Sequence, residues 1–293
     1  MQVLHEIFGK DWEASYTSQM QSEATRAIED GKIVLLPQLT FALSSEEEIF
    51  FSTEFSHPKF KNISFNPQTG LVRGAKCDVV HQAALKNMMA RYAKNASQLM
   101  SSLFPHYRNT IKIGRTSFRP IEIYGRIPKS YRKDDTRLHV DAFPMSPTQG
   151  KRIFRVFTNV NPYGKERIWR VGEPFADVAK QFLPRVKKPW PGRAAILSAL
   201  RLTKSYCTDY DYAMLQIHNL MKRDLAYQKS ATQEEVRFLP NTSWIVQTDS
   251  VSHAAMSGQF VFEQTFYLPV ESMAYPHLSP LRILEKLAGR NLA

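Results

Sequence analysis

A histidine and an aspartate stand two positions apart in the segment Arg137-Leu138-His139-Val140-Asp141. Residues two apart on an extended strand project to the same face, so His139 and Asp141 can reach one point in space. An imidazole and a carboxylate placed in this way supply two of the three ligands of a facial triad, which binds non-heme iron(II) and leaves coordination positions open. The pair alone is not specific, because the chain has eight histidines and such residues also make ordinary hydrogen bonds.

A third histidine, His253, offers the missing ligand. It follows a predicted strand at 243–247 and a polar turn, and it precedes Gly258 and a second predicted strand at 259–268. This order predicts a hairpin that could bring His253 beside the first pair. The alternative is that His253 is a turn histidine with no ligand role. The other histidines lie in N-terminal, helical or C-terminal segments that fit a metal site less well.

An oxygenase with this metal site also needs a cation for the distal carboxylate of 2-oxoglutarate. Arg155 interrupts an otherwise apolar predicted strand at 153–160. A buried charge is costly unless it is paired, so Arg155 faces either water or an anion. The planar fork of arginine pairs bidentately with a carboxylate, which makes Arg155 the first candidate and Arg152, at the edge of the strand, the second.

The blocks of secondary structure that must position these residues alternate along the chain. The predicted helices are 18–30, 78–104, the block 173–235 and a basic terminal helix at 276–291, and the predicted strands are 32–36, 121–124, 153–160, 243–247 and 259–268. Strands split by a helical block favour an α+β fold, with a β-sandwich or jelly roll that carries helices on one side. We expect one oxygenase domain, 1–293, with a mainly helical N-terminal layer at 1–110 and a helical insertion at 173–235.

Composition limits the class of protein. The chain has 293 residues, of which 43% are hydrophobic, enough for one sizeable core. Its two cysteines, Cys77 and Cys207, are far apart, so neither a disulfide framework nor a zinc knuckle is expected. We find no apolar run of the roughly 18 residues that a membrane span needs, and residues 1–10 do not resemble a signal peptide. These features predict a cytoplasmic protein.

The net charge of +12 favours polyanionic partners. Nucleic acid, an anionic lipid surface and a phosphorylated glycolipid all qualify, and charge alone does not choose among them. A basic protein without any polyanionic partner also remains open.

A set of motifs between Arg119 and Pro269 resembles the Kdo hydroxylase family. The motifs are His139-x-Asp141-Ala142-Phe143-Pro144, Pro147-Thr148-x-Gly150, Arg155-Val156-Phe157-Thr158-Asn159, Asn161-Pro162, Arg167-x-Trp169, Gly172-Glu173 and Ser252-His253. Together they are far more specific than His-x-Asp alone.

The resemblance implies a double-stranded β-helix (jelly-roll) core and an iron(II)- and 2-oxoglutarate-dependent hydroxylase that uses O2, with ascorbate as a supporting reductant. It implies the outer Kdo sugar of Kdo-lipid A, in lipopolysaccharide, as the substrate, and carbon 3 as the position hydroxylated. The family's metal ligands correspond to His139, Asp141 and His253. On this interpretation nucleic acid is not an expected partner.

The chain departs from the wider oxygenase superfamily at one place. Many members carry an Arg or Lys about ten residues after the distal histidine, but residues 260–266 contain no cation. The resemblance therefore places the 2-oxoglutarate anchor elsewhere, with Arg155 first and Arg152 second.

The basic residues also gain a specific interpretation, because Kdo carries a carboxylate and lipid A carries phosphates. The candidates for these anions are Lys129, Arg132, Lys133, Arg167 and Arg170. The terminal helix could lie on the inner membrane as a peripheral contact. Ordinary solvated loops and a packed helix are the competing interpretations.

Two other functions remain possible from the sequence. One is a 2-oxoglutarate oxygenase that retains the metal site but acts on protein or nucleic acid. The other is a non-catalytic basic binding protein with structural histidines, which would not bind iron(II) and would keep its activity after His139→Ala.

Overall fold

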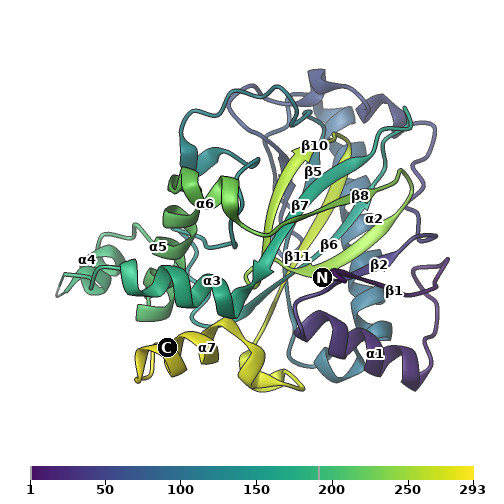
Figure 1. Ribbon diagram of the computed structural model, residues 1–293. Helices are drawn as coiled ribbons and strands as arrows, with labels where there is room; N and C mark the ends of the chain where they lie inside the picture. The colour runs from purple at the N-terminus through teal and green to yellow at the C-terminus, as the bar shows by residue number, and fades with distance from the viewer. Residues whose placement is uncertain (1, 191) are drawn as a thin grey trace.

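Two β-sheets of different size form the centre of the computed structural model, which describes residues 2–190 and 192–293. The strand order in the large sheet is β1-β2-β9-β6-β11-β5-β3-β4, and in the small sheet it is β10-β7-β8. The large sheet comprises β1 (Leu4–Glu6), β2 (Ile33–Leu36), β3 (Ile63–Phe65), β4 (Val72–Arg73), β5 (Lys112–Arg119), β6 (Arg152–Asn159), β9 (Ser243–Gln247) and β11 (Val261–Leu268). The small sheet comprises β7 (Arg167–Pro174), β8 (Glu234–Phe238) and β10 (Val251–Ser257). Figure 1 shows the small sheet in front of the large one.

Aromatic side chains fill the space between the two sheets. Phe157 and Trp244, on neighbouring strands of the large sheet, meet Trp169 and Phe238 of the small sheet. The rings of Phe238 and Trp244 stack at 3.9 Å between centroids, and the ring of Phe157 meets that of Trp169 edge-on at 5.2 Å. This apolar layer fixes the spacing of the two sheets and therefore the width of the space between them.

Strand β6 has a different partner on each of its faces. Side chains alternate along a strand, so Phe154 and Val156 point to one side while Arg155 and Phe157 point to the other. Phe154 and Val156 belong to the core beneath the helices, and Phe157 belongs to the core between the sheets. Arg155 is therefore directed into the space between the sheets.

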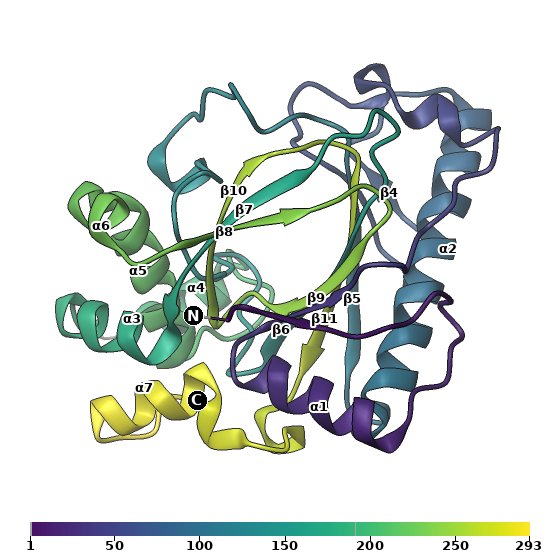
Figure 2. The same cartoon turned by 45° about the vertical axis from the view of Figure 1, so that its right-hand side comes forward.

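Two helices cover the outer face of the large sheet. They are α1 (Ser18–Glu29) and α2 (Val79–Leu103), and α2 begins at Asp78, whose side chain accepts a hydrogen bond from the backbone N–H of His81. Figure 2 shows α2 running along the side of the molecule that carries β5 and β11. The segment 1–110 thus supplies both these helices and the strands β1 to β4. Its description as a separate, mainly helical layer stays a prediction.

The remaining helices gather at the other side of the molecule (Figure 2). Between β7 and β8 lie α3 (Phe175–Phe182), α4 (Arg193–Ala199), α5 (Asp209–Arg223) and α6 (Leu225–Ser230), and near the C-terminus lies α7 (Pro280–Ala288). The four helices α3 to α6 fall within the predicted helical block 173–235. The status of this block as an insertion stays a prediction. The apolar side chains of α7, Leu281 and Leu284, are buried in the core, and α7 packs against α3. Packing in the core therefore accounts for Leu281 and Leu284, whereas Leu287 is exposed, and a membrane contact by this helix stays a prediction.

Several predicted boundaries differ from the structure. The predicted strand at 121–124 is a turn-rich segment, and the strand lies just before it as β5. His139 and Asp141 lie in an extended segment that makes a single β-bridge, rather than on a strand of either sheet. Strands β7, β8 and β10 were among those not predicted, because polar residues interrupt their alternation. The hairpin predicted around His253 is wrong: His253 lies on β10, which pairs with β7, while β9 and β11 belong to the large sheet and are separated there by β6. No helix in the described residues has the length and apolar character needed to cross a membrane.

Candidate metal centre

His139, Asp141 and His253 meet between the two sheets. One ligand atom from each lies within 4.8 Å of the others. A backbone pair holds two of them together: the N–H of His139 donates to the carbonyl of His253 (3.0 Å), and the N–H of His253 donates to the carbonyl of His139 (2.9 Å). The N–H of Asp141 donates to the carbonyl of Thr248 (2.8 Å), which fixes the carboxylate beside the bridge.

Each imidazole is oriented by a backbone carbonyl. Nδ1 of His139 lies 2.8 Å from the carbonyl oxygen of Arg137, and Nδ1 of His253 lies 2.8 Å from that of Val251. A carbonyl oxygen can only accept, so both Nδ1 atoms carry the proton and donate. Nε2 of each ring is thereby left with a free lone pair, which is the arrangement that metal-ligating histidines adopt.

Electrostatics favour the protonation states that a metal requires. Burial, together with the nearby charge of the other imidazole, lowers the pKa of His139 well below its ordinary value. Burial also lowers the pKa of His253. Burial would raise the pKa of Asp141, but the Arg155 guanidinium and the two imidazoles hold it below its ordinary range. At neutral pH the three side chains are therefore two neutral imidazoles and one carboxylate.

Arg155 lies beside the carboxylate of Asp141. Its Nη2 is 2.8 Å from Asp141 Oδ2, its Nε donates to the Thr248 hydroxyl (3.1 Å), and its Nη1 donates to Glu263. Burial would lower the pKa of Arg155, but Asp141 and Glu263 raise it above the ordinary value. The buried charge that the sequence indicated thus has two anionic partners from the protein itself.

Glu263 occupies the place where the wider superfamily carries a cation, ten residues after His253. It is fully buried, and it binds both Arg155 from β6 and Arg119 from β5. Burial would raise the pKa of Glu263, but these two guanidinium groups lower it. This chain therefore has an anion at the position where many superfamily members have a cation. The nearby cations, Arg119 and Arg155, come from the neighbouring strands β5 and β6.

Arg152 does not lie at the site. Its side chain is on the opposite face of β6 and has no exposed area. Its Nε and Nη2 donate to the Asp249 carboxylate (2.8 and 3.2 Å), and Nη2 also donates to Ser250 (2.9 Å). The second candidate for the 2-oxoglutarate anchor is therefore corrected: alternation along the strand separates Arg152 from Arg155, and Asp249 already neutralises it.

A cavity continues from the three candidate ligands into the space between the sheets. Beyond them it is lined by Arg119, Asp135, Arg155, Phe157, Arg167, Trp169, Thr248 and Ala255. Trp169 stacks on the His253 ring at 5.1 Å, and Ala255, two residues after His253 on β10, leaves space beside it. The cavity is thus polar and basic at a distance from the ligands, with one wall of aromatic rings.

Arg167 is the most unusual group in this cavity. It is 3% exposed, and its Nη1 donates to the carbonyl of Gly258 (2.9 Å). Among the described residues no carboxylate lies within ion-pair distance of it, and burial lowers its pKa to about 9. Gly258 permits this contact, because its φ is +110° and a Cβ there would lie 3.1 Å from the Arg167 Cα.

In the described part of the chain, three buried donors that line the cavity have no hydrogen-bond acceptor. They are Nε of Arg119, Nε of Arg167 and Nε1 of Trp169. Buried donors are normally satisfied, so an unsatisfied group of three lining one cavity indicates an absent acceptor. Arg167 and Trp169 lie two residues apart on β7 and share its inner face, a signal that was present in the Arg167-x-Trp169 motif.

His218 lies next to the candidate metal centre. The sequence analysis had assigned it to a helical segment that fits a metal site less well. It projects from α5, and its ring meets that of His139 edge-on at 5.3 Å. Burial, followed by the charge of Lys222, lowers its pKa to about 4. The pattern of α5 does not reveal this contact, because it depends on how the helix packs against the metal segment.

Comparison with known proteins gives consistent similarities over the whole chain. A family model described as "3-deoxy-D-manno-oct-2-ulosonic acid (Kdo) hydroxylase" matches residues 11–291. No curated protein matches the chain.

Crystal structures of one enzyme match the fold closely. The Kdo hydroxylase KdoO, a non-heme Fe(II) alphaketoglutarate-dependent dioxygenase, in complex with alphaketoglutarate and Fe(III) is 42% identical, with a TM-score of 0.96 over 100% of this chain and 98% of that one. Its complex with cobalt(II) has a TM-score of 0.97 at 42% identity, over 99% and 97% of the two chains. Its complex with succinate and Fe(III) has a TM-score of 0.95 at the same identity and coverage. Alphaketoglutarate is another name for 2-oxoglutarate.

Proposed function

The chain belongs to the Kdo hydroxylase family, and from this membership we propose that it is an Fe(II)- and 2-oxoglutarate-dependent dioxygenase that hydroxylates a Kdo sugar. The observation that carries the proposal is the meeting of His139, Asp141 and His253 at the end of a buried, basic cavity. Two imidazoles and one carboxylate are the donor set of non-heme iron(II) oxygenases.

We propose that His139 Nε2, His253 Nε2 and one Asp141 oxygen hold iron(II). Both Nε2 atoms are unprotonated because Nδ1 is the donor in each ring, and Arg155 binds the other oxygen of Asp141. Bound iron(II), with 2-oxoglutarate and O2, supplies an oxidation in which one oxygen atom enters a C–H bond and the other enters succinate, with loss of CO2. The residues of the chain set the ligand geometry and exclude water.

We propose that the distal carboxylate of 2-oxoglutarate lies against Arg167. His253 pairs with Val171 across β10 and β7, and Arg167 lies four residues before Val171, about 13 Å along the strand. Arg167 and Ala255 line the same cavity as the three candidate ligands, so Arg167 would hold the distal carboxylate of a dicarboxylate bound in this cavity. Arg119 and Trp169 supply the other unsatisfied donors. Arg155, the first candidate from the sequence, is paired with Asp141 and Glu263, so the proposal gives it the metal end of the cavity, and its role as the anchor stays an untested prediction.

The substrate proposed is the outer Kdo sugar of Kdo-lipid A, with carbon 3 as the position that receives the hydroxyl. Family membership supports the sugar, and the charge of +12 supports an anionic glycolipid. Lys129, Arg132 and Lys133 are exposed in the segment before the metal motif and are available for the anionic groups of the substrate. We do not expect nucleic acid as a partner.

The proposal extends to architecture and location. A small sheet facing a large sheet across an aromatic layer supports a double-stranded β-helix with flanking helices in one oxygenase domain. A lipid-borne sugar requires the enzyme to work at a membrane, and we place it on the cytoplasmic side of the inner membrane as a peripheral protein.

The test is a measurement of product mass. Purified protein is incubated with Kdo-lipid A, iron(II), ascorbate and 2-oxoglutarate in air, with His139→Ala as the inactive control. The proposal predicts a gain of one oxygen on the Kdo part, which requires every component except ascorbate, and one succinate per product. Fragmentation of the sugar then locates the hydroxyl.

The other outcomes are distinguishable. Succinate formation without modified glycolipid retains the oxygenase and rejects the substrate. A protein that neither binds iron(II) nor forms succinate rejects the catalytic function as a whole.

A further inference from the structure

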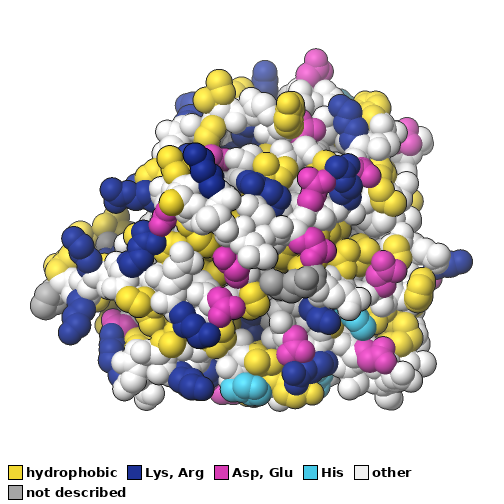
Figure 3. Space-filling view, viewed as in Figure 1, with side chains coloured by type: hydrophobic (Ala, Val, Ile, Leu, Met, Phe, Trp, Pro, Cys, Tyr) yellow, Lys and Arg dark blue, Asp and Glu magenta, His cyan; other side chains and the backbone are white. Residues whose placement is uncertain are grey.

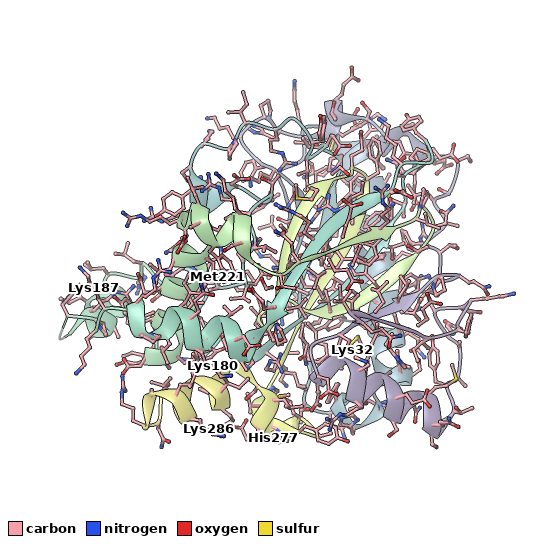
Figure 4. The ribbon with its side chains drawn as sticks, viewed as in Figure 1. Lys32, Lys180, Lys187, Met221, His277 and Lys286 are labelled. Carbon is pink, nitrogen blue, oxygen red and sulfur yellow. The ribbon has the colours of Figure 1, made fainter. Side chains whose placement is uncertain are left out.

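Helix α4 and the loops beside it form a projection with an unusual surface. We call residues 186–190 and 192–206 the α4 projection. It contains five Lys or Arg residues and no Asp or Glu. The projection lies at the outer edge of the molecule beyond α3 and α5, and Lys187 marks its tip in Figure 4.

Large apolar side chains are exposed on this projection. Of the 18 that are exposed in the described part of the chain, five lie in this short segment. They are Trp190, Ile196, Leu200, Leu202 and Tyr206, each between 47% and 64% exposed. Single exposed apolar residues are ordinary, but a group of five marks a surface that binds something.

The cations of the projection have no acidic partner within ion-pair distance among the residues that the structure describes. Among the described residues no ion pair includes Lys187, Lys188, Arg201 or Lys204, whereas Arg185, just outside the projection, pairs with Asp224. Figure 3 shows dark-blue side chains alongside yellow ones on this side of the molecule. The partner therefore offers both negative charge and an apolar region.

A lipid bilayer with anionic headgroups has that combination. Tryptophan, isoleucine and leucine side chains enter the boundary between headgroups and acyl chains, while lysine and arginine meet the lipid phosphates. A tryptophan suits this boundary because its ring is apolar and its N–H can reach a polar group.

The projection is joined to the segment that carries the metal motif. The N–H of Lys204 donates to the carbonyl of Met145 (3.0 Å), and Nε2 of Gln149 donates to the carbonyl of Tyr206 (3.3 Å). Met145, four residues after Asp141, is itself 65% exposed. A surface bound by the projection is thus held close to the loop that leaves the candidate metal centre.

We propose that the α4 projection docks the protein on a bilayer that contains anionic phospholipid, with Trp190 and Ile196 inserted and Lys187 and Lys188 on the phosphates. The inference extends the proposed function, because it names the surface that brings the enzyme to a lipid-borne substrate. Its test uses only vesicles, so it can succeed or fail independently of the activity.

The full-length protein is mixed with vesicles of phosphatidylcholine alone or of phosphatidylcholine with phosphatidylglycerol, and bound protein is measured by sedimentation. We expect binding to the anionic vesicles that decreases as salt increases. Replacing both lysines, in Lys187→Gln/Lys188→Gln, is expected to weaken it by ~30-fold. Trp190→Ser/Ile196→Ser is expected to abolish it. The matched control is Val79→Ser/Val80→Ser, an exposed apolar pair at the start of α2.

Trp190 also provides a direct signal. It is 52% exposed, whereas Trp12, Trp169 and Trp244 are buried, so its fluorescence reports on the projection. We expect a blue shift with anionic vesicles that Trp190→Phe removes while vesicle binding persists.

Three results would overturn the inference: no vesicle binding, equal binding to both kinds of vesicle, or binding that the projection variants leave unchanged. The variants alter exposed side chains, so their thermal midpoints should match that of the unmodified protein. A variant that unfolds early is replaced by Leu200→Ser/Leu202→Ser, for which the same outcomes apply.

Discussion

Nη2 of Arg155 lies 2.8 Å from Oδ2 of Asp141, so one oxygen of the candidate metal-binding carboxylate is held by the protein itself. The same guanidinium reaches Glu263 on β11 and the hydroxyl of Thr248. This contact restricts the rotation of Asp141 and leaves its other oxygen for a metal ion. Arg155 therefore connects the centre to strand β11, which carries no cation of its own between 260 and 266.

Arg155→Met is expected to destabilise the metal-free protein by about 3–5 kcal/mol, because it leaves Asp141 and Glu263 as buried carboxylates with fewer partners. Metal affinity is expected to decrease by about 10- to 100-fold, since Asp141 loses its orienting contact. Urea unfolding measures the first effect and cobalt(II) titration the second. Arg237→Met, which removes an exposed cation, should change neither, and an Arg155→Met protein with unaltered stability would contradict this role.

Arg167→Met is expected to impair 2-oxoglutarate binding without lowering stability or metal affinity, in contrast to Arg155→Met. Burial already lowers the pKa of Arg167, and no carboxylate of the described residues lies within ion-pair distance of it, so its removal should leave the free energy of unfolding unchanged or higher. The KM for 2-oxoglutarate, measured from succinate formation, should increase by roughly 10- to 100-fold, because charge-assisted hydrogen bonds are lost. Metal affinity should not change. A large loss of stability with unaltered KM would assign Arg167 to the scaffold.

Arg152→Met tests the correction of the second anchor candidate. The variant leaves Asp249 buried without its partner, and breaking such a pair costs about 3–5 kcal/mol. We expect a lower midpoint of thermal unfolding but, at a temperature where the variant is folded, an unchanged KM for 2-oxoglutarate. An increase in that KM without loss of stability would restore Arg152 as an anchor.

Acid should destabilise the protein through Glu263. Although burial would raise its pKa, Arg119 and Arg155 lower it in the native state, so the unfolded chain binds more protons as the pH falls below the ordinary value of 4.5. The stabilisation is fully present above that pH and is lost below it. Urea unfolding between pH 7 and pH 4, compared with Glu263→Gln, measures this effect, and the variant should lose less stability in acid. Equal losses would show that Glu263 does not titrate differently in the folded protein.

The sequence predicted that the three candidate ligands meet, whereas the elements around them were predicted less well. His139 and Asp141 were recognised from their spacing of two, and that spacing keeps its meaning in an extended segment outside the sheets. Strand β7 was missed because Arg167 and Arg170 interrupt its apolar residues. A strand that lines a polar cavity has charged residues on its inner face, so hydrophobic alternation does not reveal it.

The partners of buried charges could not be predicted either. Arg152 and Arg155 are three positions apart, and their sequence context does not say which of them meets Asp249 and which meets Asp141. That assignment depends on the face that each residue occupies in β6 and on the placement of loop residues outside it, of which Asp249 is 97 residues from Arg152. The amphipathic pattern of α7 was recognised correctly, but the pattern does not say that Leu281 and Leu284 are buried in the core of the protein, because a helix that packs on a core and one that lies on a membrane look the same in sequence.

Strand β6 has one face toward the helices and the other toward the candidate metal centre, so the geometry of that centre depends on the register of β6 with its neighbours. A slip of one residue against β11 or β9 would turn Arg155 toward the helices and bring Phe154 or Val156 to the candidate centre. Such a misfolded chain could keep most of its helices and strands while losing the cation that holds Asp141. On the proposed metal site, a pool of protein that folds but does not bind iron(II) would identify the molecules that paired one residue out of place.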